Sequence, residues 1–339
     1  MIFECMSSCI NQKRELAHGK GKIYPRESTM LRDERTGRSI RQITNHPSVH
    51  HHPYMLVPAY DDQMKRTIFI SHRTGSPQIF AEWRETGELL QLTDRADLNG
   101  WSVHPSHDGK HVYFTAGKGA WRVNTNTLEE EQLADFSVGR MRCNVKVTIP
   151  NAATSLSRDD RWLAMHYEED GEACIAVLNT ETGLCQKILK RDHISQVQFC
   201  PDDSFLLFYA GPLHDRVWMI YRDGTGNRRL YERNAGQKEW ITHESWIPGT
   251  RELAMINWPH GIRCVHTHTG EVRQAASFNA WHAVCSRDGK RMVADTNFPD
   301  IGIQLFDPHD GIGEPQTICF PEASNEGAHW GGSFPYDHG

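Results

Sequence analysis

The sequence predicts an all-β fold of the β-propeller class, of the seven-bladed type with an incomplete last blade. Turn residues recur at blade-like intervals, each turn is followed by short apolar or alternating runs, and no segment sustains a helical repeat of apolar positions. We expect one propeller domain over residues 23–339, with about six recognisable blades within residues 49–320. Because one four-stranded sheet cannot bury both faces alone, the blades should pack radially around a channel.

The first signal is a turn rich in Asp and Gly that recurs at intervals of about 40 to 51 residues, a spacing typical of propeller blades. The six turns are Asp61-Asp62, Asp108-Gly109, Asp159-Asp160, Asp202-Asp203, Pro248-Gly249 and Asp288-Gly289.

Apolar or alternating runs follow each turn, and their β-branched and aromatic content predicts half-buried strands. These runs are RTIFISH (66–72), HVYFTA (111–116), WLAMHYE (162–168), FLLFYAG (205–211), ELAMINW (252–258) and RMVADT (291–296). A second strand then completes a hairpin in each unit. These second runs begin at residues 78, 119, 174, 217, 263 and 302.

The two ends of the chain differ from the repeat. Residues 1–22 look like a disordered extension without the apolar core of a signal peptide. The segment RQIT (41–44) resembles QLT (91–93), which closes the first unit, so it is a candidate outer strand of a blade completed by the C-terminus. The tail ends without the expected turn and strands, so we expect the last blade to be incomplete. Open strand edges would then favour self-association.

Composition places the chain among ordinary globular proteins, with 38% hydrophobic residues, 24% charged residues and a formal net charge of -6. Mild acidity argues against a nucleic-acid partner, and no stretch is long and apolar enough for a membrane span. The nine cysteines are scattered without CxxC pairs, which indicates reduced thiols and a cytoplasmic location. We assign them no chemistry.

Histidine is unusually frequent, with twenty residues, several of them in or near the strand that should line the channel. Any single histidine is more often a hydrogen-bonded structural residue than a catalytic one. His50, His51 and His52 are consecutive, and because side chains alternate along a strand, at most two of the three can share one site. We expect His51 to be the one that points toward the channel. No DxDxDG calcium loop occurs. The candidates are His50, His51, His52, His104, His193, His243 with Glu244, and His282.

Three segments resemble oligogalacturonate lyases, and the resemblance extends over roughly residues 40–310. AGPLHDRVWMIYRDG (210–224) contains Arg216, ITHESWIPGT (241–250) contains His243, and WHAVCSRDGKRMVADT (281–296) contains His282. VHHHPYM (49–55), which contains His51, is a looser match. The blade turns themselves are shared with many TolB-like propellers.

The resemblance implies a seven-bladed enzyme that cleaves short galacturonate chains by β-elimination with a divalent metal, Mn²⁺ being our expectation. It implies that His243 is the base that takes the C5 proton, that Arg216 binds the uronate carboxylate and that His282 is a metal ligand; we add His51 as a substrate-binding candidate. Imidazole suits a base near neutral pH, and a guanidinium suits a planar carboxylate.

The chain departs from the family at the C-terminus, where the family supplies its other metal ligands from a Gln-x-x-His-x-His segment that is absent here. His329 or His338 could replace those ligands only by coincidence, and stable sites usually need three or more protein donors. The alternative function is therefore a non-catalytic TolB-like propeller that binds or scaffolds. A hydrolase or peptidase is disfavoured because no GxSxG nucleophile motif occurs.

Overall fold

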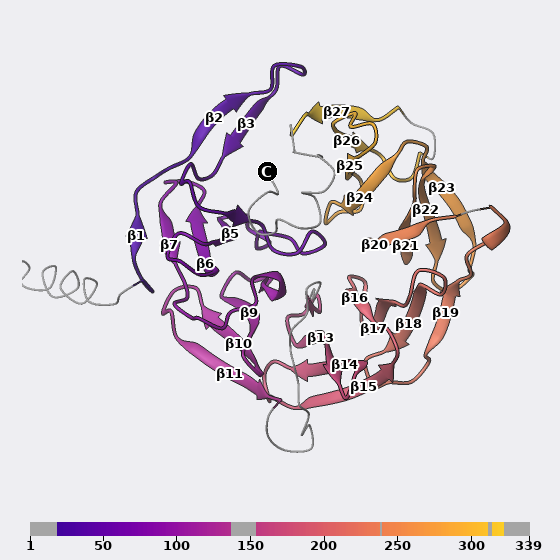
Figure 1. Ribbon diagram of the computed structural model, residues 1–339, viewed down its shortest axis with the longest axis horizontal. Helices are drawn as coiled ribbons and strands as arrows, with labels where there is room; N and C mark the ends of the chain where they lie inside the picture. The colour runs from indigo at the N-terminus through magenta and orange to yellow at the C-terminus, as the bar shows by residue number, and fades with distance from the viewer. Residues whose placement is uncertain (1–18, 137–153, 238, 311–313, 322–339) are drawn as a thin grey trace, which may run out of the picture. The chain divides into compact units, whose positions relative to one another are not determined.

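The computed structural model describes residues 19–136, 154–237, 239–310 and 314–321 (Figure 1). Over these ranges the secondary structure consists of 27 strands and two short 3-10 helices, η1 (Gly100–Ser102) and η2 (Ala235–Gln237). The predicted all-β class is therefore confirmed. In the described part of the chain, no helix is long and apolar enough to cross a membrane.

Contacts divide the chain into two units, Met1–Thr29 with Arg41–Arg142, and Met30–Ile40 with Cys143–Gly339. The described part of the first unit holds two sheets, in the strand orders β1-β7-β6-β5-β4 and β11-β10-β9-β8. Their strands are β1 (Ile23–Tyr24), β4 (His50–His51), β5 (Arg66–Ser71), β6 (Gln78–Trp83), β7 (Leu89–Gln91), β8 (His104–Pro105), β9 (His111–Ala116), β10 (Gly119–Asn124) and β11 (Glu130–Asp135).

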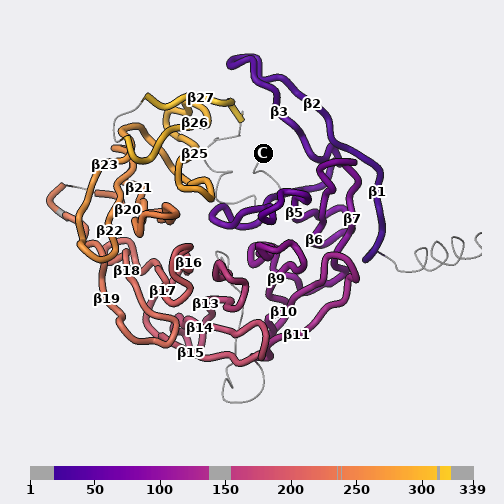
Figure 2. Tube along the Cα trace, turned by 180° about the vertical axis from the view of Figure 1, so that it is seen from behind, coloured from indigo at the N-terminus to yellow at the C-terminus, as the bar shows by residue number. Residues whose placement is uncertain are grey.

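The described part of the second unit holds four sheets of four antiparallel strands, each in sequence order. Within this unit, the first strands of three sheets lie along one side and the last strands of three sheets lie along the opposite side (Figures 1 and 2). The first strands are β16, β20 and β24, and the last strands are β15, β19 and β23. The strands are β12 (Ser155–Leu156), β13 (Trp162–Glu169), β14 (Glu172–Asn179), β15 (Cys185–Arg191), β16 (Ser195–Cys200), β17 (Asp203–Ala210), β18 (Val217–Tyr221), β19 (Arg228–Tyr231), β20 (Ile241–Ile247), β21 (Glu252–Asn257), β22 (Gly261–His266), β23 (Val272–Ala276), β24 (Ala280–Cys285), β25 (Met292–Thr296), β26 (Ile303–Phe306) and β27 (Gln316–Cys319).

The predicted hairpins are those observed, because every predicted first strand overlaps β5, β9, β13, β17, β21 or β25, and each pairs with the next strand in the chain. Three of the predicted turns share one hydrogen-bonded arrangement, in which a serine hydroxyl donates to the aspartate two residues later. The pairs are Ser106–Asp108, Ser157–Asp159 and Ser286–Asp288. The serine is a turn signal that the Asp/Gly pattern did not include.

The apolar core lies between neighbouring sheets. One cluster contains Val177 of β14 and Phe199 of β16, another contains Phe208 of β17 and Met255 of β21, and corresponding clusters join the other neighbouring sheets within each unit. Apolar residues must therefore face both sides of a sheet, which explains why the middle strands are nearly continuous apolar runs. Six blade-sized sheets in the described residues, packed in this way, confirm the β-propeller class.

The described structure begins at residue 19, on the N-terminal side of the predicted domain boundary at residue 23. Residues 1–18 of the predicted extension lie outside the described residues, but the Gly21 amide donates to the carbonyl of Gln91 at 2.9 Å. The candidate strand at 41–44 overlaps β3 (Ser39–Gln42), which pairs with β2 (Thr29–Arg32) in a two-stranded sheet. Beside β2, Asp33 accepts a hydrogen bond from the Phe320 amide at 2.6 Å.

Candidate functional site

The first strands of three successive sheets in the second unit carry a β-bulge at the same point. In β16, β20 and β24 the pairing register skips one residue shortly after the strand begins. A bulge places two residues opposite one and re-aims their side chains, so neighbouring residues need not point to opposite faces of the sheet. The bulged residues are Gln196 with Val197, His243 with Glu244, and Trp281 with His282. Two of the predicted site residues therefore lie at equivalent bulges in adjacent sheets.

His243 is held as a neutral imidazole with one nitrogen fixed. Its backbone is left-handed, with φ of +46°, and its Nδ1 lies 2.7 Å from the carbonyl oxygen of Trp281. Because a carbonyl only accepts, Nδ1 must carry the hydrogen, which leaves the lone pair of the neutral ring on Nε2. Burial, followed by the neighbouring His282, lowers the pKa of His243 to about 3. The ring is therefore neutral at neutral pH, and its Nε2 is unprotonated.

His282 lies beside His243, with 4.3 Å between ring centroids. Its Nδ1 is 2.7 Å from Oδ2 of Asp295, and its backbone amide donates to Oδ1 of the same carboxylate at 2.6 Å. Two bonds from one carboxylate fix both the position and the orientation of the imidazole. This arrangement is typical of a histidine whose remaining nitrogen acts on a ligand. Sequence reasoning missed Asp295, although it lies in β25, the hairpin partner of β24.

Arg216 approaches the same bulge from the start of β18. Its Nε donates to Oε1 of Glu244 at 2.7 Å; the Glu244 side chain is fully buried and that of Arg216 is 12% exposed. No hydrogen bond from the two terminal nitrogens is found within the described residues, so both can donate to a carboxylate. A second bond fixes Glu244, because the side-chain amide of Gln198 donates to its carbonyl at 2.7 Å.

Of the remaining histidine candidates, His51 and His104 lie in the first unit, whereas His193 lies in the second unit, near enough to Arg216 for its charge to act on the imidazole. In the first unit, the ring of His51 stacks on Trp101 at 4.4 Å, and burial lowers the pKa of His51 to about 4. His104 is buried, with Nδ1 2.9 Å from the carbonyl of Pro105, which is a structural contact. In the second unit, burial and then the charge of Arg216 lower the pKa of His193.

The metal prediction lacks a complete ligand set over the described ranges. No group of three or more His, Cys, Asp and Glu residues there could hold a metal ion. His282 has the orientation expected of one ligand, but His329 and His338 lie outside the described residues. These residues alone do not fit a manganese site, which normally requires more protein donors.

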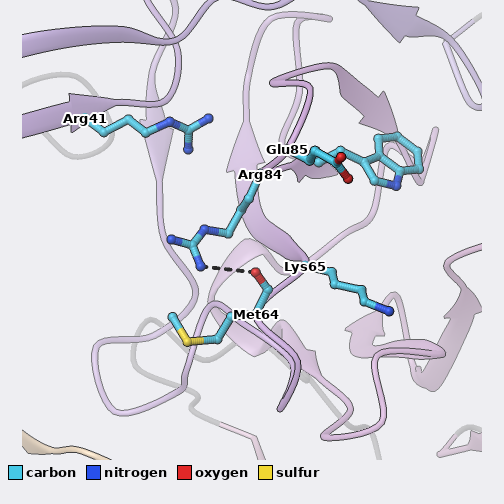
Figure 3. A pocket seen from close by; sticks show the side chains of 6 residues that line it. Arg41, Met64, Lys65, Arg84 and Glu85 are labelled. Carbon is cyan, nitrogen blue, oxygen red and sulfur yellow. Dashed lines mark hydrogen bonds between the residues drawn. The ribbon is translucent and has the colours of Figure 1, made fainter.

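The first unit contains an open pocket of about 470 Å³, lined by Arg41, Met64, Lys65, Trp83, Arg84 and Glu85 (Figure 3). The guanidinium of Arg84 donates to the Met64 carbonyl at 3.1 Å, while Arg41 forms an ion pair with the buried Glu82. This lining contains three cations and the carboxylate of Glu85 but no histidine, the residue type that the resemblance implies as the base. We therefore place the candidate active site at the bulges of β20 and β24.

Comparisons with known proteins agree with the fold. No protein-family model and no curated protein match the chain. A solved structure of oligogalacturonate lyase in complex with manganese is 20% identical, with a TM-score of 0.78, covering 91% of this chain and 88% of that chain. The oligogalacturonate lyase from Vibrio parahaemolyticus is 19% identical, with the same TM-score and coverage. Hydrazine synthase from Kuenenia stuttgartiensis is 11% identical, with a TM-score of 0.55, covering 83% and 89%.

Identities of 19% and 20% support a common fold and leave the activity to be argued from the site itself. The share of the chain that aligns is large enough to include all six blade-sized sheets of the described residues. The chain is therefore a β-propeller with the architecture of the two oligogalacturonate lyase structures.

Proposed function

We propose that the protein is a lyase that cleaves oligogalacturonate by β-elimination. The observation that carries this proposal is the arrangement at the β20 bulge. Among the described residues, no hydrogen bond is found at Nε2 of His243 or at the terminal nitrogens of Arg216, and the ring of His282 lies beside that of His243. A base and a carboxylate-binding cation are the two groups that this reaction requires. The fold shared with two oligogalacturonate lyases supports the choice of substrate.

The proposed reaction begins with the uronate carboxylate bound to the terminal nitrogens of Arg216. Nε2 of His243 takes the C5 proton, the C5–H electron pair becomes the C4–C5 double bond, and the C4–O bond breaks with its electrons on the departing oxygen. The departing oxygen takes a proton from solvent to become a hydroxyl, and His243 then returns its proton to solvent. The positive charge of Arg216 stabilises the negative charge that develops on the carboxylate during proton removal. The products are a shortened chain and a 4,5-unsaturated uronate, and no water is consumed.

Mn²⁺ remains part of the proposal through the metal ligand predicted at His282 and through the structural neighbour that was solved in complex with manganese. A divalent metal would supply further stabilisation of the developing enediolate. Because the described residues do not complete a ligand set, we derive no step through the metal. Asp295 would act as the residue that orients His282.

A cytoplasmic location also remains a proposal. It is supported by the six cysteines within the described ranges, all of which are free thiols. Intracellular reducing conditions would keep them so. An oligosaccharide that has entered the cell is then the expected substrate.

The direct test is ultraviolet absorbance of the conjugated double bond during incubation with digalacturonate, with and without added Mn²⁺. We expect absorbance to rise with the native protein and to stay at background with His243→Gln. An exposed histidine provides the matched control, so His260→Gln should behave as the native protein. If the native protein gives no rise with Mn²⁺ or any other divalent metal, the lyase proposal is wrong and a binding module becomes the better explanation.

A further inference from the structure

Three tryptophans form a row that leads away from His243. The ring of His243 packs edge-to-face with Trp281 at 4.9 Å, Trp281 packs the same way with Trp258 at 6.0 Å, and Trp258 packs with Trp240 at 5.9 Å. We call Trp281, Trp258 and Trp240 the tryptophan row. Since each ring contact joins one member to the next, the row is continuous from the candidate base to its outer member.

The outer end of the tryptophan row is open to solvent. Trp240 is 44% exposed, whereas Trp258 and Trp281 are partly buried. Exposing this much of an indole leaves a flat apolar face in water that a ligand can cover. Among the described residues, packing covers more of the two inner members and leaves part of the Trp240 ring uncovered.

The backbone at Trp240 is fixed independently of its ring. The Trp258 amide donates to the Trp240 carbonyl at 3.1 Å, and the Trp240 amide donates to the Asn257 side-chain oxygen at 3.3 Å. The second member is fixed as well, because the indole nitrogen of Trp258 donates to Asn297 at 2.8 Å. The exposed ring is therefore presented from a rigid support, which reduces the entropy lost when a ligand binds.

A sugar ring is the ligand whose chemistry fits such a surface. One face of a galactose-type pyranose presents C–H groups that pack flat on an aromatic ring, while its hydroxyls and carboxylate remain at the edge in water. Aromatic side chains combine a large apolar face with rigidity, which is the combination that binding sites use. An oligosaccharide bound at His243 has further rings that must lie on the neighbouring surface.

We propose that Trp240 is a stacking platform for a sugar ring of the substrate beyond the galacturonate held by Arg216. This inference rests on the proposed function, because it extends the same site outward. It predicts that chain length matters: a single galacturonate can fill the Arg216 position without touching Trp240, whereas a trimer reaches both.

The test compares the binding of galacturonate and trigalacturonate by isothermal titration calorimetry, and every protein in it, native at Trp240 or not, carries His243→Gln so that the trimer is not cleaved. We expect Trp240→Ala to weaken trigalacturonate binding about tenfold and to leave galacturonate binding unchanged. Trp240→Leu, which keeps apolar bulk without an aromatic face, should show the same selective loss. Phe205→Ala is the matched control, because Phe205 is also an exposed aromatic but lies near the start of β17, away from Arg216.

The outcomes separate this inference from the proposed function. If the protein that keeps Trp240 binds trigalacturonate and both Trp240 variants bind it equally well, the stacking platform is wrong while the site remains. An equal loss for both sugars would also overturn it, because that result indicates a general disturbance of the site. If the protein that keeps Trp240 binds neither sugar, the proposed substrate itself is wrong.

Discussion

The bulges of β16 and β20 are the same in backbone and different in chemistry. In each bulge, two residues lie between consecutive paired residues and face a single residue of the partner strand. The first bulged residues, Gln196 and His243, have φ of +49° and +46°. The second residues are Val197 and Glu244, both buried. The repeat thus provides one backbone device in adjacent sheets, and only the side chains in β20 give it a base and a carboxylate.

The positive φ of both residues has a cost. A left-handed backbone is unfavourable for a residue other than glycine, by roughly 1 to 3 kcal/mol in strained sites. Gln196 is buried, and its side-chain oxygen has no hydrogen-bond partner within the described ranges. Since both bulges retain this strain, the shared geometry belongs to the fold, and the difference in function depends on the residue at its apex.

The largest expected effect comes from replacing His243 of β20 with glutamine, the residue at the equivalent position of the β16 bulge. His243→Gln keeps a polar side chain at the bulge but removes the nitrogen that accepts the C5 proton. We expect kcat for oligogalacturonate cleavage to fall by roughly 10²- to 10⁴-fold, the usual contribution of a general base. Steady-state kinetics measures this, with His260→Gln as the control. A loss below about tenfold would show that another group removes the proton.

The next effect concerns stability beside the β16 bulge. His166 lies in β13 and is 6% exposed, and burial, followed by the nearby His193, lowers its pKa to about 4. An unfolded chain binds a proton at this histidine below its ordinary pKa of about 6.5, whereas the folded chain does not, so stability falls as pH falls below that value. Between pH 7 and pH 5 we expect this group to lower the free energy of unfolding by about 2 kcal/mol.

Urea unfolding of the native protein and of His166→Leu at both pH values measures the contribution of His166. The variant should lose about 2 kcal/mol less than the native protein on acidification. His260→Gln, at an exposed position, should lose as much as the native protein. Equal losses in all three proteins would contradict the burial of a neutral His166.

A smaller effect on stability should follow from removing one hydrogen bond between the two bulged strands. Gln198 of β16 donates to the buried carbonyl of Glu244 in β20, so Gln198→Leu leaves that carbonyl without its partner. We expect the free energy of unfolding to fall by about 1.5 kcal/mol. Gln63→Leu, at an exposed turn, should change it by less than about 0.5 kcal/mol. Equal stability of the two variants would mean that the inter-strand bond contributes nothing.

The smallest effect should come from Glu244→Gln, which keeps the shape of the side chain but removes the charge that positions Arg216. We expect kcat/KM for digalacturonate to fall about tenfold, since a less firmly held guanidinium binds the carboxylate less well and stabilises its developing charge less. Galacturonate binding should weaken as well. Unchanged kcat/KM and unchanged galacturonate binding would contradict a positioning role for Glu244.

Much of the fold could be predicted because its signals are local. The Asp/Gly turns and the apolar runs that follow them lie within short stretches, and they locate the two middle strands of every blade. The resemblance to oligogalacturonate lyases selected His243, His282 and Arg216, and the structure brings these three residues together. Their catalytic roles remain predictions, as does substrate binding by His51, which lies in the other unit.

The bulges could not be predicted, because a bulge is a property of the pairing between two strands. Simple alternation in β20 sends His243 and Glu244 to opposite faces, and nothing in the sequence near them marks the skipped residue. The bond between Arg216 and Glu244 joins residues that are 28 positions apart, so no local pattern indicates it. Asp295 was missed for the same reason, because its contact with His282 forms only when β24 and β25 pair.

The most direct test of the central claim is mass spectrometry of the products from trigalacturonate. β-Elimination at the His243 site predicts fragments that together have the mass of the substrate, one of them an unsaturated uronate, and predicts no fragments with His243→Gln. Fragments that together exceed the substrate by one water would show hydrolysis. That result, or equal product formation by the His243→Gln variant, would contradict the account.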